Sequence, residues 1–374
     1  MTVILADDAI PYLDQIFGQN KPQQLSVVQC PGREIASADL TAVDGLLLRT
    51  VTQVNRQLLE KSSVRYVATA SAGFDHFNLA DLARLNIDWY AARGCNARAV
   101  AEYVIAVIAL LQLQGKLATE WVKIGVIGVG HVGSKVAELL TKIGITVICY
   151  DPPRQLLDAS FNSADLDALY HCHMLSCHLP LVRQGRDATI GLIDPLLADL
   201  ADKTIILNAG RGESLSLSAI RKHPEHDYIL DVWDSEPSIR LCDLNLKQIK
   251  LMTPHIAGYG IRDKYNASCM AAHWLATKLA INYQPVALPT AELLDARTAK
   301  TWQEAVLMAY DPRVDQMKIR ALAGSADNID SGSVMIESLR KSYALRAPFA
   351  RDIKTSCLKK NEMSMLSKLG FSLL

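Results

Sequence analysis

Short apolar runs separated by helix-length polar segments recur over the first quarter of the chain. These runs are Val3–Leu5, Leu46–Leu48 and Tyr66–Ala68. Apolar runs of strand length that alternate with helical segments are typical of a parallel sheet with helices packed against it. Residues 1–95 are therefore predicted to form a small α/β domain.

A longer apolar segment follows this region. Ala99–Leu113 is apolar around most of its circumference when drawn as a helix, which predicts a buried helix that joins two domains. Asn96 stands just before the segment, where a short polar side chain commonly caps a helix N-terminus. We therefore expect Asn96 to cap this helix.

Strand-length apolar runs then recur at fairly regular intervals as far as residue 252. They are Ile124–Ile127, Thr146–Tyr150, Leu175–His178, Thr204–Leu207, Tyr228–Val232 and Leu251–Thr253. The pattern predicts a doubly wound parallel sheet of about six strands within residues 96–258. A helix over about 266–283 is expected to return to the first domain. Pro285 and Pro289 then mark a boundary before a third region, residues 290–374.

The overall composition changes this picture little, but it excludes some classes of protein. Lys+Arg and Asp+Glu both number 39 among 374 residues, so no broad charge favours nucleic acid or an anionic membrane. The most apolar stretch, Tyr103–Leu111, is too short to span a bilayer. The first residues carry two acids and no basic leader, so no signal peptide is expected. The eight cysteines form no CxxC pair, which suits reduced thiols in a cytoplasmic protein.

The segment Val122–Asp151 carries the most specific chemistry. An apolar run enters Gly128-Val129-Gly130-His131-Val132-Gly133, a helical segment follows, and a second apolar run ends in Asp151. This is the order of a dinucleotide-binding βαβ unit, in which the pyrophosphate sits at the helix N-terminus. The three glycines permit a tight turn, close approach to the pyrophosphate and close helix–strand packing. Asp151 would accept hydrogen bonds from the ribose hydroxyls, which favours NAD over NADP.

Polar clusters follow three of the later strand candidates. They are Asn208–Gly212, Asp231–Pro237 and Thr253–Tyr259. Together they bring an arginine, one or two acids and a histidine to the rim where an open parallel sheet binds its ligands. Hydride transfer at an alcohol carbon needs a proton acceptor, a carboxylate that orients it and a cation for the substrate. Taken singly, each residue could equally brace a turn or face solvent, but their occurrence together favours the functional interpretation.

A metal site is not predicted. His171-Cys172-His173 and Cys177-His178 look like a metal-binding tract, but a zinc site needs four convergent ligands. Residues 174–178 are predicted to form a core strand, whose alternation would send Cys177 and His178 to opposite faces.

The order of these motifs along the chain carries a family resemblance. The motifs are residues 128–133, Asp151, His178–Leu181, Asn208–Gly212, Asp231–Pro237 and Thr253–Gly258. The chain resembles the D-isomer-specific 2-hydroxyacid dehydrogenases. Further segments are similar to the branch that oxidises 4-phospho-D-erythronate with NAD in pyridoxine biosynthesis. These segments are Leu48–Asn55, Ala70–His76, Gly94–Ala97, Tyr150–Arg154, His255–Tyr259, Ser338–Tyr343 and Lys368–Phe371.

The resemblance implies a fold and a set of residue roles. It implies a Rossmann-type NAD-binding domain over residues 96–258, a flavodoxin-like substrate domain over residues 1–95 and a small α+β dimerisation domain over residues 290–374. Arg211 would bind the substrate's carboxylate end, and His255 would exchange the hydroxyl proton while paired with Glu236. Cofactor contacts are implied for Gly128, Gly130, His131, Val132, Gly133, Asp151, Leu179, Ala209, Gly210, Arg211, Asp231 and Gly258. Substrate contacts are implied for Thr50, Ser71 and Tyr259.

A phosphorylated substrate needs a second anion-binding group. Arg49 and Thr50 follow the apolar run Leu46–Leu48, and Ser71 follows the next such run. We therefore expect Arg49 to contact the phosphate at a strand's carboxyl end, although a solvated surface arginine is the alternative.

Leu179, Arg93 and residues 213–228 depart from the pattern of the narrower branch. Two other functions stay open, namely another D-2-hydroxyacid dehydrogenase, such as one for 3-phosphoglycerate, and an NAD-sensing interaction protein without turnover.

Overall fold

The contacts among residues divide the folded chain into two units. Unit 1 comprises Met1–Asn96 and Gly260–Pro289, and unit 2 comprises Ala97–Tyr259 and Thr290–Leu374. Residues 290–374 therefore share a unit with the predicted dinucleotide-binding segment. The division into three domains stays a prediction.

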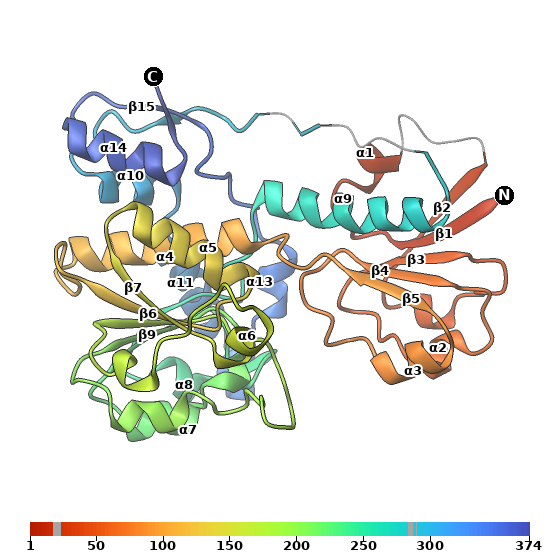
Figure 1. Ribbon diagram of the computed structural model, residues 1–374, viewed down its shortest axis with the longest axis horizontal. Helices are drawn as coiled ribbons and strands as arrows, with labels where there is room; N and C mark the ends of the chain where they lie inside the picture. Colours follow the sequence, from red (N-terminus) through yellow and green to blue (C-terminus); the bar gives the residue numbers. More distant parts are fainter. Residues whose placement is uncertain (18–23, 283–286, 289) are drawn as a thin grey trace. The chain divides into compact units, whose positions relative to one another are not determined.

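Figure 1 shows the computed structural model, which describes residues 1–17, 24–282, 287–288 and 290–374. The predicted boundary at Pro285 and Pro289 lies outside these residues. Within them, no helix is both long enough and apolar enough to cross a membrane.

Unit 1 is built on a parallel sheet in the order β2-β1-β3-β4-β5. Its strands are β1 (Thr2–Asp7), β2 (Leu25–Cys30), β3 (Gly45–Leu48), β4 (Tyr66–Thr69) and β5 (Asp88–Ala91). This is the flavodoxin-like order, in which the winding direction changes between β1 and β3. The flavodoxin-like prediction is confirmed. The sequence did not predict β2 and β5, because both are partly exposed edge strands without a continuous apolar run.

The helices of unit 1 come from both ends of its sequence. They are α1 (Leu13–Phe17), α2 (Arg56–Leu59), α3 (Leu79–Arg84) and α9 (Ile261–Lys278), with a 3-10 turn at Ile35–Ser37. Helix α9 lays small and apolar side chains against the centre of the sheet, where Ala271 and Leu275 meet Ile4 and Leu47. A helix is therefore present where one was predicted over 266–283, but it starts earlier, directly after Gly260, and ends earlier, at Lys278.

Unit 2 is built on a parallel sheet in the order β12-β10-β9-β8-β6-β7. Its strands are β6 (Lys123–Ile127), β7 (Thr146–Tyr150), β8 (Met174–Cys177), β9 (Ile205–Asn208), β10 (Asp227–Leu230) and β12 (Ile249–Met252). Each of the six predicted strands is present, so the doubly wound Rossmann-type sheet is confirmed. Its winding direction changes between β6 and β8, which is where such sheets bind ligands.

The remaining elements of unit 2 cover this sheet or follow it in sequence. The helices are α4 (Ala97–Leu113), α5 (His131–Lys142), α6 (Pro152–Leu157), α7 (Leu217–Lys222), α8 (Leu241–Leu244), α10 (Trp302–Ala309), α11 (Pro312–Ala323), α12 (Ala326–Ser331), α13 (Glu337–Lys341) and α14 (Lys360–Leu369). Short 3-10 helices lie at Leu166–Leu169, Asp194–Ala198 and Gly212–Ser214. The later strands are β11 (Ser238–Arg240), β13 (Leu294–Asp295), β14 (Ser333–Met335), β15 (Asp352–Lys354) and β16 (Ser372–Leu373).

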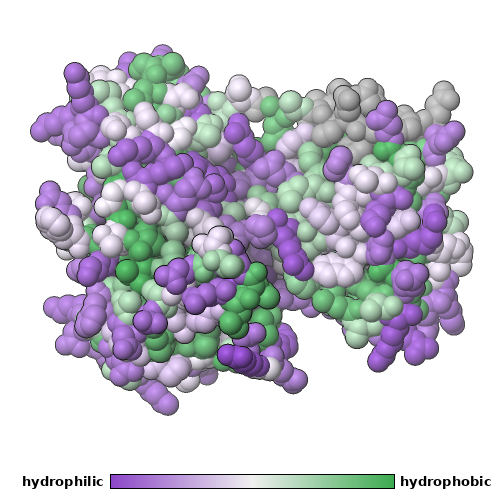
Figure 2. All heavy atoms as spheres, viewed as in Figure 1, coloured by the Kyte–Doolittle hydropathy of each residue, from purple (hydrophilic) through white to green (hydrophobic). Residues whose placement is uncertain are grey.

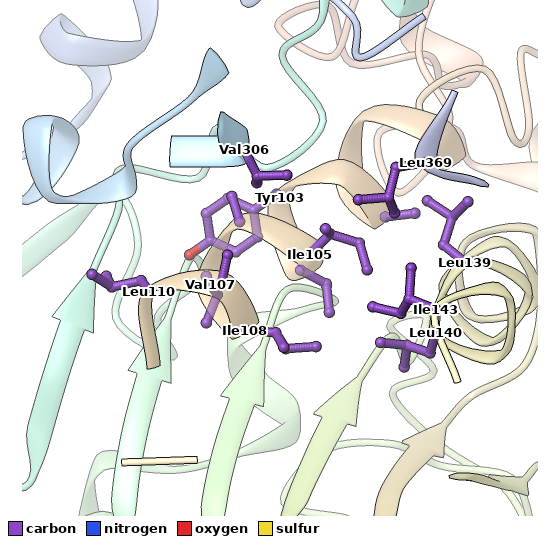
Figure 3. Packing of buried hydrophobic residues seen from close by; sticks show 14 of the residues in the cluster. Tyr103, Ile105, Val107, Ile108, Leu110, Leu139, Leu140, Ile143, Val306 and Leu369 are labelled. Atoms are coloured by element: carbon purple, nitrogen blue, oxygen red, sulfur yellow. The ribbon is translucent and has the colours of Figure 1, made fainter. Parts of the chain in front are cut away.

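Helix α4 is buried along almost its whole length, as its apolar circumference predicts. Figure 3 shows its side chains meeting those of α5, α10 and α14, including Tyr103, Leu139, Val306 and Leu369. The predicted cap is wrong, because the Oδ1 atom of Asn96 is buried without a hydrogen-bond partner. Helix α4 is therefore stabilised by packing on several sides rather than by a side-chain cap.

The C-terminal region, residues 290–374, contains short strands and helices, as predicted for an α+β region. Strands β13, β15 and β16 pair in parallel, and β14 pairs antiparallel with β11. Helix α11 covers the edge strand of the large sheet, where the Met252 N–H donates to Gln316 Oε1 at 3.1 Å. The visible face in Figure 2 carries hydrophilic side chains interspersed with small apolar patches, which fits a chain with balanced charge.

Candidate active site

The predicted site residues of unit 2 lie along one edge of its sheet. This edge, here called the carboxyl rim, consists of residues 128–133, 151–154, 178–181, 208–212, 231–237 and 253–259, which follow β6, β7, β8, β9, β10 and β12. Because β6, β8, β9, β10 and β12 are successive neighbours in the sheet, the rim presents the glycine motif, Arg211, Glu236 and His255 in spatial order. The rim therefore extends from the predicted cofactor end to the predicted catalytic end.

The glycine motif has the backbone geometry that its sequence predicts. Gly128 has a φ of +80°, a conformation that residues with a side chain rarely adopt. A Cβ atom on Gly133 would lie 2.1 Å from the carbonyl oxygen of Gly128, so the close packing of helix and turn requires glycine there. A Cβ atom on Gly130, in contrast, would meet nothing within 4 Å. The space beside Gly130 is therefore open to a ligand.

The first turn of α5 suits a dinucleotide pyrophosphate. Gly130 precedes the helix and has no side chain to cap it, so the first N–H groups of α5 stay available for an anion. His131 is exposed and Val132 is half-buried at this end. The positive end of the helix dipole adds to the attraction. The residues present thus fit a bound dinucleotide.

Asp151 holds the glycine motif in place. It precedes α6, and its Oδ2 accepts from the Val129 N–H at 2.7 Å while its Oδ1 accepts from the Arg154 N–H at 3.0 Å. Arg154 reinforces the arrangement by donating to the Val129 carbonyl and to Ser134 Oγ. A carboxylate has further lone pairs, so Asp151 can brace the turn and still accept from ribose hydroxyls. The sequence did not predict the role of Arg154.

Backbone contacts connect the middle segments of the rim. A Cβ atom on Gly210 would lie 2.7 Å from the Leu179 nitrogen, and one on Gly128 would lie 3.0 Å from the His178 carbonyl. Glycine at positions 128 and 210 therefore lets three neighbouring strand ends come together. Leu179 is buried and Ala209 is half-buried in this group. These residues line the rim at the predicted middle of the cofactor site.

The loop that carries Arg211 is fixed by the buried Asn208. Its Nδ2 donates to the Arg211 carbonyl at 3.0 Å, and its Oδ1 accepts from the Gly210 N–H at 3.1 Å. The Ser214 hydroxyl also donates to the Arg211 carbonyl, at 2.8 Å. Three hydrogen bonds thus fix the backbone around Arg211, which is half-buried. Asn208 belongs to the motif that the sequence indicated, but its positioning role was not predicted.

Glu236 and His255 form a hydrogen-bonded pair. His255 Nδ1 lies 2.7 Å from Glu236 Oε2, and Glu236 Oε1 accepts from the Trp233 N–H at 3.0 Å. Burial alone would raise the pKa of the Glu236 carboxyl, but His255, the Trp233 N–H and Arg340 outweigh it, so this pKa is lowered. Glu236 is therefore an anion that accepts the Nδ1 proton of His255, which leaves Nε2 with the free lone pair.

The Arg211 loop packs against the segment that carries Glu236. A Cβ atom on Gly212 would lie 1.9 Å from the Trp233 carbonyl oxygen and 2.7 Å from the Asp234 nitrogen. The same Trp233 residue donates its N–H to Glu236. A continuous chain of backbone contacts thus runs from the arginine loop to the acid–base pair. The structure brings these predicted residues onto neighbouring strand ends of one unit.

Asp231 is buried, and its hydrogen bonds hold the loop that carries His255. Oδ1 accepts from the Thr253 hydroxyl at 2.7 Å and the Ile256 N–H at 2.8 Å, and Oδ2 accepts from the Ala257 N–H at 3.0 Å. We therefore interpret Asp231 as the anchor of this loop. Its predicted contact with the cofactor stays a prediction, as does that of the partly exposed Gly258.

The predicted substrate residues of unit 1 lie at the carboxyl ends of β3 and β4. Arg49 and Thr50 follow β3, next to the switch point between β1 and β3. Arg49 Nη1 donates to the Ala9 carbonyl at 3.2 Å, and Thr50 is exposed. The Ser71 hydroxyl donates to the Gly73 carbonyl at 2.8 Å, so it would have to reorient before donating to a ligand. Tyr259 belongs to unit 2, where its ring packs edge-on against Tyr343.

One group of metal-ligating side chains is found outside the rim. His223, Glu225 and His226 offer ligand atoms within 4.8 Å of one another in the part of the chain that the structure describes. His223 Nδ1 lies 2.8 Å from Glu225 Oε1, and His226 Nε2 lies 2.9 Å from the Leu197 carbonyl, so these atoms are engaged in hydrogen bonds within the chain. We therefore assign no metal to the group.

Comparison with known proteins identifies the family. The NAD-binding domain of the D-isomer specific 2-hydroxyacid dehydrogenases matches residues 112–257. The chain is 35% identical to an erythronate-4-phosphate dehydrogenase of Teredinibacter turnerae, over 99% of this chain and 98% of that protein. A second such enzyme, from Coxiella burnetii, is 36% identical over 94% of each chain.

Solved structures agree with the fold. NAD-bound 3-phosphoglycerate dehydrogenase of Entamoeba histolytica has a TM-score of 0.60 at 21% identity, and the match covers 77% of this chain and 99% of that one. A formate dehydrogenase of Staphylococcus aureus in complex with NAD has a TM-score of 0.56 at 19% identity, over 77% of this chain and all of that one. The chain therefore belongs to the erythronate-4-phosphate dehydrogenase family of D-isomer-specific 2-hydroxyacid dehydrogenases, which are NAD-dependent oxidoreductases.

Proposed function

We propose that this enzyme oxidises 4-phospho-D-erythronate to 3-hydroxy-2-oxo-4-phosphooxybutanoate and that it acts in pyridoxine biosynthesis. The observation that carries the proposal is the hydrogen bond of 2.7 Å between His255 Nδ1 and Glu236 Oε2 at the rim of an NAD-binding sheet. The full-length similarity to erythronate-4-phosphate dehydrogenases supports the choice of substrate.

The chain supplies the groups that move a proton and hold the substrate. NAD, when bound, provides the acceptor for the hydride that leaves C2 of the substrate. His255 Nε2 accepts the proton of the C2 hydroxyl as the carbonyl forms, and Glu236 stabilises the resulting imidazolium. Arg211 binds the substrate carboxylate through two parallel hydrogen bonds and orients C2. Substrate and NAD thus yield the 2-oxo acid, NADH and one proton.

The substrate assignment is tested by following NADH formation with a panel of acids. The panel contains 4-phospho-D-erythronate, D-erythronate, 3-phosphoglycerate and D-lactate. We expect the highest kcat/KM for 4-phospho-D-erythronate. A preference for 3-phosphoglycerate or for an unphosphorylated acid would instead support the alternative dehydrogenases, and NAD binding without turnover of any acid would support the sensor.

The distal phosphate is proposed to bind at the switch point of unit 1. Arg49 is a half-buried cation there, and it lies close enough to Asp7 for their charges to interact. Arg49→Ala should raise KM for 4-phospho-D-erythronate by about 10- to 100-fold, the value of a hydrogen bond to a charged group. KM for unphosphorylated D-erythronate should change far less.

Steady-state kinetics with both substrates test this role of Arg49. Arg56→Ala is a matched control, because it removes an arginine from exposed α2 in the same unit, where Arg56 pairs with Glu60 at 2.9 Å. Equal effects of Arg49→Ala on both substrates would make Arg49 a structural residue. The phosphate would then be held elsewhere, for example by Arg93, whose guanidinium stacks on Phe74 at 4.5 Å.

Asp151 is proposed to select NAD over NADP, because its charge repels a 2′-phosphate. Asp151→Asn keeps an acceptor for the Val129 N–H but removes the charge. We expect the ratio of kcat/KM for NAD to that for NADP to fall by about tenfold or more, equivalent to about 1.4 kcal/mol. Asp165→Asn is the control and should leave the ratio unchanged, because Asp165 is an exposed acid in the segment after α6 whose side chain caps no helix. Equal use of both cofactors by the unmodified enzyme would refute the assignment.

We also propose that two copies assemble through the C-terminal region. Exposed apolar side chains occur in α10, α11, α12 and β14, namely Met308, Val314, Met317, Ile329 and Met335. Where such side chains form a contiguous patch, they commonly mark an interface. Light scattering on the purified protein should give twice the chain mass.

The eight cysteines, all within described residues, are free thiols, which suits the reducing cytoplasm.

A further inference from the structure

The C-terminal region contacts the chain directly beside Glu236. Strand β14 pairs antiparallel with β11, which begins two residues after Glu236. At the end of this pairing, the Ile336 N–H donates to the Pro237 carbonyl at 3.3 Å. The segment after the carboxylate of the acid–base pair is therefore held by residues about one hundred positions later in the sequence.

The same region also contacts the loop that carries His255. The guanidinium of Arg346 donates to the Ala257 carbonyl, and it lies 3.3 Å from the Ala99 carbonyl. The backbone N–H of Arg346 donates to the Tyr259 carbonyl at 3.0 Å. One residue thus binds the backbone of the histidine loop at two points and links it to the start of α4.

The guanidinium of Arg346 is enclosed by aromatic rings. Its central carbon lies 4.2 Å from the ring centroid of Tyr310 and 5.8 Å from that of Tyr103, and its Nη1 is buried. Tyr103 in turn lies 2.9 Å from the Thr253 hydroxyl, which donates to Asp231. Planar stacking and forked donors are properties of arginine that lysine lacks. The side chain is therefore a fixed connection rather than a solvated charge.

The histidine loop needs such a connection because its backbone is strained. His255 has a φ of +58°, a conformation that costs of order 1–3 kcal/mol for a residue with a side chain and persists only when the surroundings enforce it. Asp231 binds the loop through the N–H groups of Ile256 and Ala257. Arg346 binds it from the carbonyl side. The two residues together fix both hydrogen-bonding edges of the backbone that follows His255.

We propose that Arg346 is a positioning residue for the reaction: by holding the Ala257 and Tyr259 carbonyls, it keeps the His255 ring aligned with Glu236 and with the substrate hydroxyl. The proposal rests on the proposed function, because it assigns His255 as the proton acceptor. The guanidinium of Arg346 contacts aromatic rings and backbone carbonyls of the chain itself. It acts on turnover through the geometry of the loop, so substrate binding depends on it much less than the rate does.

The test compares Arg346→Gln and Arg346→Lys with the unmodified enzyme. Arg346→Gln should lower kcat by about 10- to 100-fold, the cost of a misplacement of about 1 Å, with little change in KM for substrate or NAD. Arg346→Lys keeps the charge but replaces the planar fork with a single ammonium group, so it should retain more of kcat. Arg351→Gln is the matched control, because Arg351 is a partly buried arginine of the same segment whose Nη2 reaches the Ala309 carbonyl at 3.5 Å and not the loop.

A second measurement does not depend on turnover. In protein labelled at histidine, the ring resonances of His255, assigned through His255→Ala, should shift in Arg346→Gln and stay in place in Arg351→Gln. Unchanged kcat and unchanged resonances in Arg346→Gln would overturn the inference, as would equal losses in Arg351→Gln. If Arg346→Gln does not fold, Arg346→Lys decides by the same criteria. Failure of the unmodified enzyme to oxidise 4-phospho-D-erythronate, with the resonance shift present, would count against the proposed function and not against this role.

Discussion

Replacing His255 with alanine is expected to lower kcat by about two to four orders of magnitude, the usual contribution of a positioned acid–base group. The substrate hydroxyl proton then has only water as its acceptor. NAD affinity should be unchanged, because the glycine motif and Asp151 lie at the other end of the rim. The measurement is steady-state kcat with 4-phospho-D-erythronate, together with NAD titration by fluorescence. Near-normal turnover in this variant would show that another group accepts the proton.

Glu236→Gln separates the charge of the pair from its geometry. The amide can still hydrogen-bond to His255 Nδ1, but the negative charge beside the imidazolium is lost. Since the imidazolium that forms when His255 takes the substrate proton is then less stable, kcat should fall by about tenfold or more, equivalent to about 1.4 kcal/mol. The measurement is steady-state kcat of the variant and of the unmodified enzyme with 4-phospho-D-erythronate. An unchanged kcat would mean that the charge of Glu236 does not support the proton transfer.

Replacing Arg211 with glutamine is expected to lower kcat/KM by about 100- to 1000-fold, comparable with the loss of a donor aimed at developing charge. The side chain would no longer offer a cationic fork to the substrate carboxylate. Arg211→Lys keeps the charge without the fork, so it should recover only part of the loss. Arg183→Gln is a matched control, because Arg183 is an exposed arginine in the loop after β8. Its Nη2 lies 3.9 Å from Glu213 Oε1.

The outcome is read from kcat/KM with 4-phospho-D-erythronate and from NAD binding. Arg183→Gln should resemble the unmodified enzyme in both. If Arg211→Gln weakens NAD binding as strongly as it lowers kcat/KM, then Arg211 is part of the cofactor site rather than the substrate site.

The large sheets were predictable because their strands are continuous apolar runs that end in polar residues. The four inner strands of unit 2, β6, β8, β9 and β10, are buried along almost their whole length, so hydrophobicity alone marks them. Strands β2 and β5 were not predicted from the sequence, because an edge strand is partly exposed and needs no continuous apolar run. The start of α9 was not predicted for a related reason. Its first turn carries Arg262, Asp263 and Lys264, which read as a polar loop until the helix reaches the sheet.

The site was predictable as far as side chains follow strand ends. Arg211, Glu236 and His255 come directly after neighbouring strands, so sequence position and spatial order coincide. Residues that hydrogen-bond to backbone groups cannot be recognised in this way from their position in the sequence. Arg346 binds two carbonyls that every residue possesses, and it lies almost ninety positions after them. Only the folded chain shows that β14 and Arg346 return to the two segments of the acid–base pair.

The discontinuity of unit 1 has a consequence for synthesis on the ribosome. Its sheet is complete once Ala91 has been made, but α9, which covers Ile4 and Leu47, starts only at Ile261. At about 5–20 residues per second, these roughly 170 intervening residues take about 10–30 seconds to emerge. During that interval the apolar face of the nascent sheet has no access to its own helix, while the whole of β6 to β12 is being translated. We therefore expect chaperones that bind apolar surfaces to act on the sheet of unit 1 during this interval.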